Sequence, residues 1–187
     1  MRRLLTLAVT VGAVAATASA VDLRSVIETP DAKQIIAKDL LGPAKTYTMP
    51  EGCITTDPDA IARGKFIFHN LNGSKAKGDL PKGLAKTQMK EGKTYLPGDE
   101  IPPKQYGNCV ACHNIEDAQG GGDIGPDLSH YREYFVDSGA RTPAWVFQKI
   151  ADARVDNPET VMTINLTTGL FTEKEICEIT SYIVSKK

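Results

Sequence analysis

The sequence predicts an all-α fold with long loops. Three segments, 57–70, 142–156 and 172–183, carry apolar residues at the 3.6-residue spacing of a helix that buries one face. Two of the three open with a helix-capping signal. No segment shows the alternation of apolar and polar residues that is typical of a half-buried strand, and no internal repeat is evident.

Length and composition fit one globular domain with added segments. The chain has 187 residues, 41% of them hydrophobic, with 22 Lys and Arg against 23 Asp and Glu. A chain this apolar is not disordered, and this charge balance lacks the basic footprint of a nucleic-acid-binding protein. Its cysteines are too few for a disulfide scaffold, so each is expected to have an individual role. They are Cys53, Cys109, Cys112 and Cys177.

Residues 1–20 have the three parts of a secretory signal peptide. Two arginines follow Met1, residues 4–16 are apolar or small, and residues 18–20 read Ala-Ser-Ala, a small-residue cleavage site. The apolar run is too short to span a bilayer. We expect cleavage after Ala20, which leaves 187 − 20 = 167 residues with a formal charge of (22 − 2) − 23 = −3 and no membrane span. The sequence thus predicts a periplasmic protein whose cysteines meet an oxidising environment.

Residues 21–56 are expected to form an extension that precedes the main domain. A short helix is predicted there, with Thr29 and Pro30 as its start and Gly42 as its stop. One small helix is not stable alone in water. We therefore expect its apolar face to dock on the core or on a partner.

The first helix of the main domain, 57–187, is predicted over 57–70. Its buried face would carry Ile61, Gly64, Ile67 and Phe68. Glycine in the middle of a helix costs about 0.8–1 kcal/mol relative to alanine. Close approach of another helix is the usual reason for a glycine at such a place.

Residues 71–104 interrupt the helical pattern and are interpreted as an inserted loop. The segment is rich in Gly and Pro, and it carries seven Lys against four acidic residues. A solvated surface loop is one interpretation. A basic rim that guides an acidic partner is the other.

Two further helices are predicted after residue 140. Thr142 caps the first, Pro143 occupies its first position, and residues 157–158 (Asn-Pro) end it. The last helix begins with a capping box between Thr172 and Glu175. The apolar anchors expected on these two helices are Trp145, Phe147 and Ile150, and then Ile176, Ile179, Tyr182 and Ile183.

The sequence Cys109-Val110-Ala111-Cys112-His113 is the attachment pattern for a c-type haem. Two thiols at this spacing can form thioethers with two vinyl groups of one porphyrin, and the adjacent histidine then ligates the iron. A zinc site would need two more ligands, a redox dithiol would need a βαβ context, and a disulfide between residues three apart is uncommon. We therefore predict one covalently bound haem c, with His113 as an axial ligand.

The second axial ligand decides the chemistry of the iron. Met162 is favoured, because it lies in an irregular stretch between two helices and belongs to no apolar stripe. A methionine opposite a histidine raises the reduction potential and leaves no open position for oxygen or substrate. The other candidates are Met89, then His130, with Met49 and His69 also in the mature chain.

Pro126 is predicted to hold His113 in place. A haem-ligating histidine donates its other ring N–H to an acceptor. The carbonyl of Pro126 suits this role because proline has a fixed φ and no competing N–H. An ordinary turn proline is the alternative.

Cys53 and Cys177 are the two cysteines outside the motif. In an oxidising compartment two such thiols tend to pair. A bridge would tie the extension to the last helix and contribute about 2–4 kcal/mol. Two separate buried thiols are the alternative.

The chain resembles class I cytochromes c over residues 57–187. Besides the haem motif and Met162, the resemblance rests on Gly64, Phe68, Gly125-Pro126-Asp127-Leu128 and a capped last helix with Tyr182. It implies the class I cytochrome c fold, in which the first and last helices cross at a glycine against an aromatic residue. The chain departs from the family in the 71–104 insertion and in Thr163, where the family often has proline.

Within that family the chain is most similar to SoxX subunits of the SoxAX cytochromes. Residues 122–129, 152–154 and 157–162 carry this resemblance, together with the extension and the insertion. It implies a periplasmic heterodimer with a SoxA-like subunit. Such a complex is an L-cysteine S-thiosulfotransferase, which couples thiosulfate to a cysteine of a SoxYZ-like carrier and releases two electrons.

The role implied for this chain is electron transfer within that complex. The chain has no evident catalytic residues of its own. It would accept the electrons and pass them to another cytochrome c. A free periplasmic shuttle without a fixed partner is the alternative, and a haem enzyme with an open iron position would require that Met162 not bind.

Overall fold

The described part of the chain is all-α, as predicted. The helix expected from Thr29 and the signal peptide lie outside the described residues. Within the described residues no strand occurs, and the one β-type pairing is an isolated bridge between Thr87 and Pro103. The computed structural model describes residues 42–71, 75–88 and 94–185.

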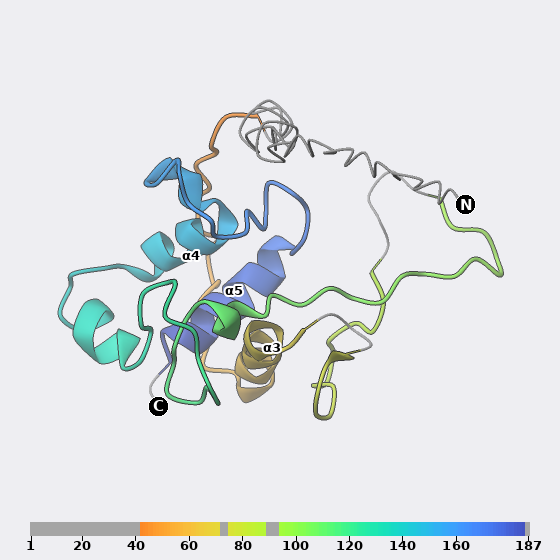
Figure 1. Cartoon of the computed structure of the whole chain (residues 1–187), viewed down its shortest axis with the longest axis horizontal. Helices are drawn as coiled ribbons and strands as arrows, with labels where there is room; N and C mark the ends of the chain where they lie inside the picture. The colour runs from red at the N-terminus through yellow and green to blue at the C-terminus, as the bar shows by residue number, and fades with distance from the viewer. Residues whose placement is uncertain (1–41, 72–74, 89–93, 186–187) are drawn as a thin grey trace, which may run out of the picture. The chain divides into compact units, whose positions relative to one another are not determined.

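In the part of the chain that the structure describes, three α-helices carry the core, and side chains cap them where the sequence signals indicated. Thr142 accepts a hydrogen bond from the backbone N–H of Trp145, and Thr172 forms the reciprocal capping box with Glu175. Both caps satisfy backbone donors that have no partner within the helix. The helices are α3 (Pro58–His69), α4 (Pro143–Ala151) and α5 (Glu173–Ile183) (Figure 1).

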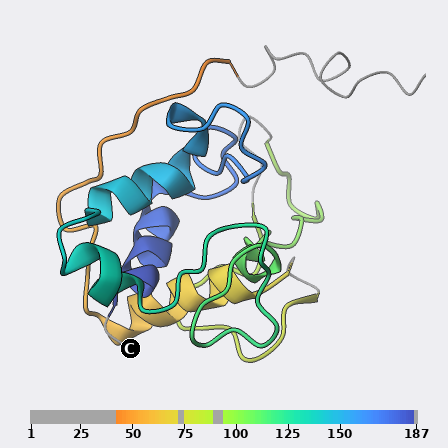
Figure 2. The same ribbon diagram turned by 60° about the vertical axis from the view of Figure 1, so that its left-hand side comes forward.

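Helices α3 and α5 cross at Gly64 (Figures 1 and 2). A Cβ atom at Gly64 would lie 2.0 Å from the carbonyl oxygen of Glu178, so only glycine lets the two backbones approach this closely. The close approach of another helix predicted at Gly64 is confirmed. The aromatic Tyr182 lies one turn further along α5 and packs on Phe68, with 5.6 Å between the ring centres.

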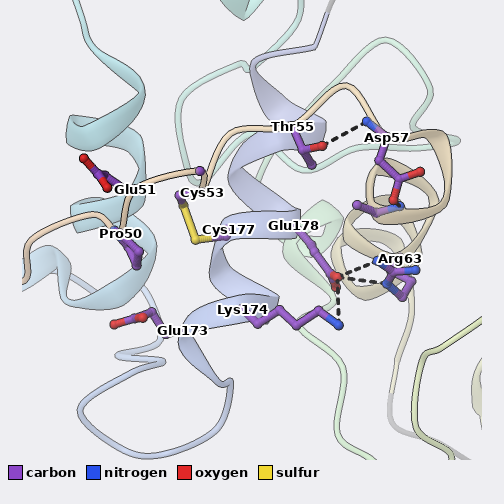
Figure 3. A pocket seen from close by; sticks show the side chains of 12 residues that line it. Pro50, Glu51, Cys53, Thr55, Asp57, Arg63, Glu173, Lys174, Cys177 and Glu178 are labelled. Atoms are coloured by element: carbon purple, nitrogen blue, oxygen red, sulfur yellow. Dashed lines mark hydrogen bonds and ion pairs between the residues drawn. A yellow bond between two sulfur atoms is a disulfide. The ribbon is translucent and has the colours of Figure 1, made fainter.

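A buried ion pair lies beside this crossing. The carboxylate of Glu178 is 2.8 Å from Nη2 of Arg63 and accepts a hydrogen bond from its Nε at 2.9 Å. Figure 3 shows Glu178 between Arg63 and Lys174. Because Glu178 is 4% exposed, removal of Arg63 would leave a buried charge without its main partner. Arg63 also donates from Nη1 to the carbonyl of Lys82, which ties the inserted loop to the crossing.

Helix α4 is shorter than predicted. It ends at Ala151 rather than near residue 156, because Asp152 adopts an extended conformation with φ −158°. The Asp152 carboxylate then caps a separate turn of 3₁₀-helix, Ala153–Val155, by accepting from the N–H of Arg154. The helical pattern of the sequence continues across this break and therefore does not indicate it.

Trp145 is not a core anchor of α4, contrary to the prediction. It is 37% exposed, with the Arg141 guanidinium 4.7 Å and the Lys149 ammonium 4.8 Å from its ring centre. Phe147 and Ile150 are buried as predicted, next to a valine and an alanine that complete the face. The buried face of α4 is therefore rotated away from the tryptophan.

The described part of the inserted loop is more than a solvated surface. Leu84 joins the core, and Lys104 is only 3% exposed. The Lys104 ammonium lies 2.8 Å from Glu175 at the start of α5 and over the ring of Phe171. A buried lysine needs such a partner, so this charge belongs to the fold rather than to a basic rim.

Residues 42–56, which we call the strap, pass along α4 and α5 (Figure 2). The predicted disulfide is present and joins Cys53 of the strap to Cys177 of α5 (Figure 3). Ser181 adds two hydrogen bonds, from its hydroxyl to the carbonyl of Cys53 and from the N–H of Thr55 to its oxygen. The extension is therefore held on the last helix by a covalent bond and by hydrogen bonds.

The other end of the strap is held by polar side chains at the end of α4. Gln148 accepts from the N–H of Tyr47 at 2.7 Å and donates to the carbonyl of Lys45 at 3.0 Å. Asp152 is fully buried and accepts from the N–H of Lys45 and from the Arg154 guanidinium. Burial alone would raise the pKa of Asp152, but the hydrogen bonds outweigh it and lower the pKa from 3.8 to about 2.

The lowered pKa of Asp152 predicts a loss of stability in acid. Because the folded pKa lies below the unfolded one, the carboxylate stabilises the native state above its unfolded pKa of 3.8, and this contribution disappears as the pH falls toward about 2. The shift corresponds to roughly 2 kcal/mol. Denaturant unfolding of the wild type and Asp152→Asn should show a difference in unfolding free energy at neutral pH that shrinks in acid.

Asp137→Asn is the matched control, because Asp137 pairs with Arg132 on the exposed surface. It should change the unfolding free energy little at either pH. An Asp152→Asn difference that is the same at neutral and acid pH would contradict the assignment.

Candidate functional site

The Cys109–His113 motif begins against the end of α3. The N–H of Gly107 donates to the carbonyl of Ile67 at 2.9 Å, and the N–H of Asn108 donates to the carbonyl of Asn70 at 3.0 Å. Asn108 itself is in the left-handed region, with φ 46°, which turns the chain into the motif. The position of the motif is therefore set by the C-terminal end of α3.

The backbone of the motif folds as a single turn. Residues Cys109–Ala111 form a turn of 3₁₀-helix, and the N–H groups of Cys112 and His113 both donate to the carbonyl of Cys109. The two thiols and the imidazole therefore extend from the same short turn of the chain.

Cys109 and Cys112 are free thiols, both half-buried. The interpretation of the motif as a local disulfide therefore finds no support. Burial raises the pKa of the Cys109 thiol to about 12, with a smaller contribution from Cys112. Catalytic dithiols have lowered pKa values, so the environment of Cys109 is the opposite of a redox-active one.

His113 is held in one orientation by the backbone of the following loop. Its Nδ1 lies 2.9 Å from the carbonyl oxygen of Pro126, the contact that the sequence predicted. A carbonyl oxygen only accepts, so Nδ1 carries the proton and donates. Nε2 is therefore left with its lone pair, as an iron ligand must be.

Gly125 packs against the imidazole face. A Cβ atom there would lie 2.4 Å from Cε1 and 2.6 Å from Nδ1 of His113, which no side chain can tolerate. Gly122 is in a similar position, because its Cβ would lie 2.2 Å from the carbonyl oxygen of Ala111. Neither glycine was predicted to be a packing residue, although the Gly-rich composition of residues 120–125 could have indicated a close approach of the backbone there.

Hydrogen bonds fix the loop that carries Pro126. The N–H of Gly125 donates to the carbonyl of Cys112 at 2.8 Å, so the loop is bonded to the motif itself. Asn114 then donates from Nδ2 to Asp127 and to Ser129. Hydrogen bonds from Ser129 and Asn114 lower the pKa of Asp127, which keeps it ionised. The orientation of His113 thus depends on a preorganised loop.

Met162 lies on a separate segment, between the 3₁₀ turn Ala153–Val155 and α5. It is half-buried and packs against the same core cluster as Cys109. Its backbone N–H donates to Oγ1 of Thr160 at 3.1 Å. The hydrogen bonds of the described residues do not join Met162 to His113.

The other candidate ligands have different surroundings. Nε2 of His69 is hydrogen-bonded to the Tyr182 hydroxyl at 2.7 Å, which fits the edge of the core. His130 is exposed and lies 3.9 Å from each of two glutamates. Met49 packs on the core from the strap, and Met89 lies outside the described residues. Of the methionines in the described ranges, Met162 alone follows the break after α4.

The motif supplies two thiols and one imidazole, which is a donor set that a haem could use. In the described ranges, no group of three or more His, Cys, Asp or Glu residues could hold a metal ion. A haem iron takes four ligands from its porphyrin, so one histidine and one thioether complete its coordination.

A pocket of about 340 Å³ lies elsewhere, beside the disulfide (Figure 3). It is formed by the strap and by the first turns of α3 and α5. Its charged lining residues are of both signs, and three of them, Arg63, Lys174 and Glu178, form the ion pairs beside the helix crossing. The residues that line it are Pro50, Glu51, Gly52, Cys53, Thr55, Asp57, Ala60, Arg63, Glu173, Lys174, Cys177 and Glu178.

None of the helices in the described ranges is long and apolar enough to cross a membrane. Comparison of the chain with protein-family models, with curated proteins and with solved structures found no match. The assignment of a function therefore rests on the motif residues and on their geometry.

The packing of Gly125 predicts that a single methyl group there displaces His113. In Gly125→Ala the Cβ would collide with the imidazole and break the hydrogen bond to Pro126. The hydrogen-bonded Nδ1–H signal of His113, which ¹H–¹⁵N NMR of the wild type should detect, should disappear. The unfolding free energy should fall by about 1–3 kcal/mol.

Ile124→Ala is the matched control, since Ile124 is the neighbouring residue and is 71% exposed. It should preserve the Nδ1–H signal. Retention of that signal in Gly125→Ala would show that the ring does not depend on this packing.

Proposed function

We propose that this chain is a monohaem c-type cytochrome that transfers electrons. The observation that carries the proposal is the state of His113: Nδ1 is bonded to the Pro126 carbonyl and Nε2 is free, one residue after a half-buried free thiol. Cys109 and Cys112 would hold the haem covalently, and His113 and Met162 would be its axial ligands. Pro126 would orient His113.

The haem, when bound, supplies a one-electron Fe(III)/Fe(II) couple. His113 and Met162 would both ligate its iron, and no coordination position would then remain for oxygen or a substrate. A thioether ligand favours the reduced iron and so raises the reduction potential. These residues therefore suit transfer of electrons between partners rather than catalysis on the iron.

The class I cytochrome c fold is part of this proposal. Two features of the described residues support it: the crossing of the first and last helices of the domain at Gly64, and the position of the motif against the C-terminal end of the first of them. The family resemblance implies an aromatic residue against this glycine, whereas the atoms nearest to a Cβ at Gly64 belong to the backbone of Glu178, and Tyr182 packs one turn further along α5, on Phe68. The insertion and the strap are additions to that fold.

The particular role proposed is that of a SoxX-like subunit in thiosulfate oxidation. The chain would pair with a SoxA-like cytochrome in the periplasm. It would accept the electrons released when thiosulfate is coupled to a cysteine of a SoxYZ-like carrier, and pass them to another cytochrome c. The sequence resemblance supports this role, and the Cys53–Cys177 disulfide fits an oxidising compartment.

Removal of Met162 tests the ligand assignment. Met162→Ala should abolish the weak near-infrared sulfur-to-iron band of the oxidised protein, because no thioether then reaches the iron. The reduced variant should bind carbon monoxide at neutral pH, since an axial position is open. Met49→Ala removes another half-buried methionine on the same core and should preserve the band. A band that survives in Met162→Ala would identify a different ligand.

Purification from the native periplasm tests the proposed partner. The chain should co-elute with a second c-type cytochrome, and cells without it should stop consuming thiosulfate until the wild-type chain is restored. Elution as a lone monomer, with thiosulfate consumption unchanged in its absence, would exclude this role and leave a free electron shuttle.

A further inference from the structure

One buried carboxylate, that of Asp152, holds both ends of the segment that carries Met162. Before the methionine, Oδ1 accepts from the N–H of Arg154 at 3.1 Å and so begins the 3₁₀ turn. After the methionine, Oδ2 accepts from the hydroxyl of Thr167 at 3.0 Å. Asp152 is 0% exposed, so these bonds are shielded from water.

The Thr167 hydroxyl extends this link to the strap. Its oxygen lies 2.9 Å from the hydroxyl oxygen of Tyr47. Thr167 has one hydroxyl proton, which it donates to the ionised Asp152, so Tyr47 must be the donor to Thr167. The result is a directed chain from Tyr47 through Thr167 to Asp152.

Further contacts attach the segment between these anchors. Lys149 of α4 forms an ion pair with Asp156, Leu166 donates its N–H to the carbonyl of Ala151, and Asn165 donates from Nδ2 to the carbonyl of Ile150. Met162 itself packs against the core, and its backbone N–H is bonded within its own turn, to Thr160. Val161 beside it is 85% exposed. The bonds at the two flanks therefore contribute to holding Met162 in place.

We propose that Asp152, Thr167 and Tyr47 are positioning residues that hold Met162 as an iron ligand and set how easily another ligand replaces it. This inference rests on the proposed function. Replacement of Met162 requires its segment to move away, and the bonds to Asp152 and Thr167 oppose that movement. Weaker bonds raise the fraction of open protein, and the apparent affinity for a competing ligand rises in proportion.

The test is an imidazole titration of the oxidised holoprotein, in which the loss of the near-infrared sulfur-to-iron band is the readout. Thr167→Val keeps the shape of the side chain but removes its bonds to Asp152 and Tyr47. The imidazole concentration that removes half of the band should fall about tenfold, as expected for loss of a hydrogen bond to a charged group. Tyr47→Phe removes a neutral bond only and should lower that concentration by a smaller factor, about threefold.

Thr180→Val is the matched control. Thr180 is fully buried on α5, and its hydroxyl donates to the carbonyl of Ile176 at 2.7 Å, away from the Met162 segment. It should lower the denaturant midpoint of unfolding but leave the imidazole concentration unchanged. A fall in Thr167→Val that is absent in Thr180→Val supports the inference.

Two other outcomes overturn it in different ways. If the wild type has the band and all three variants titrate like it, these residues do not position Met162, while the proposed function stands. If the wild type lacks the band, methionine ligation fails and the inference fails with it.

Discussion

The fold depends on the close crossing of α3 and α5, which the missing side chain of Gly64 permits. The end of α3 carries the Cys109–His113 turn through two backbone hydrogen bonds, and α5 carries the strap through the Cys53–Cys177 disulfide. A wider separation of these helices would move both attachments. The positions of the proposed haem site and of the strap therefore both depend on the backbone contact between Gly64 and Glu178.

The two proposed iron ligands are held in different ways. His113 is fixed by backbone groups, namely the Pro126 carbonyl and the α-carbon of Gly125, and these have little freedom to move. Met162 is on a segment whose flanks are held by side chains, of which Asp152 has the most bonds. Side-chain contacts open at lower cost than a preorganised backbone. We therefore expect exchange of ligands to occur on the Met162 side.

The sequence could predict the caps at Thr142 and Thr172, because their cause lies within a few residues. It also indicated the glycine at the crossing and the contact between His113 and Pro126, because glycine and proline have backbone properties that no other residue shares. It could not predict the end of α4 at Asp152 or the burial of Lys104. Both depend on partners far along the chain, Lys45 and Thr167 for one and Glu175 for the other.

The mass of the denatured mature protein shows whether Cys109 and Cys112 hold a haem covalently, as proposed. Thioether formation adds each thiol across a vinyl group without loss of atoms. Covalent attachment therefore predicts the mass of the polypeptide plus one intact haem, which stays with the protein in acidified organic solvent. A polypeptide of unmodified mass, with any haem released into the solvent, would contradict it.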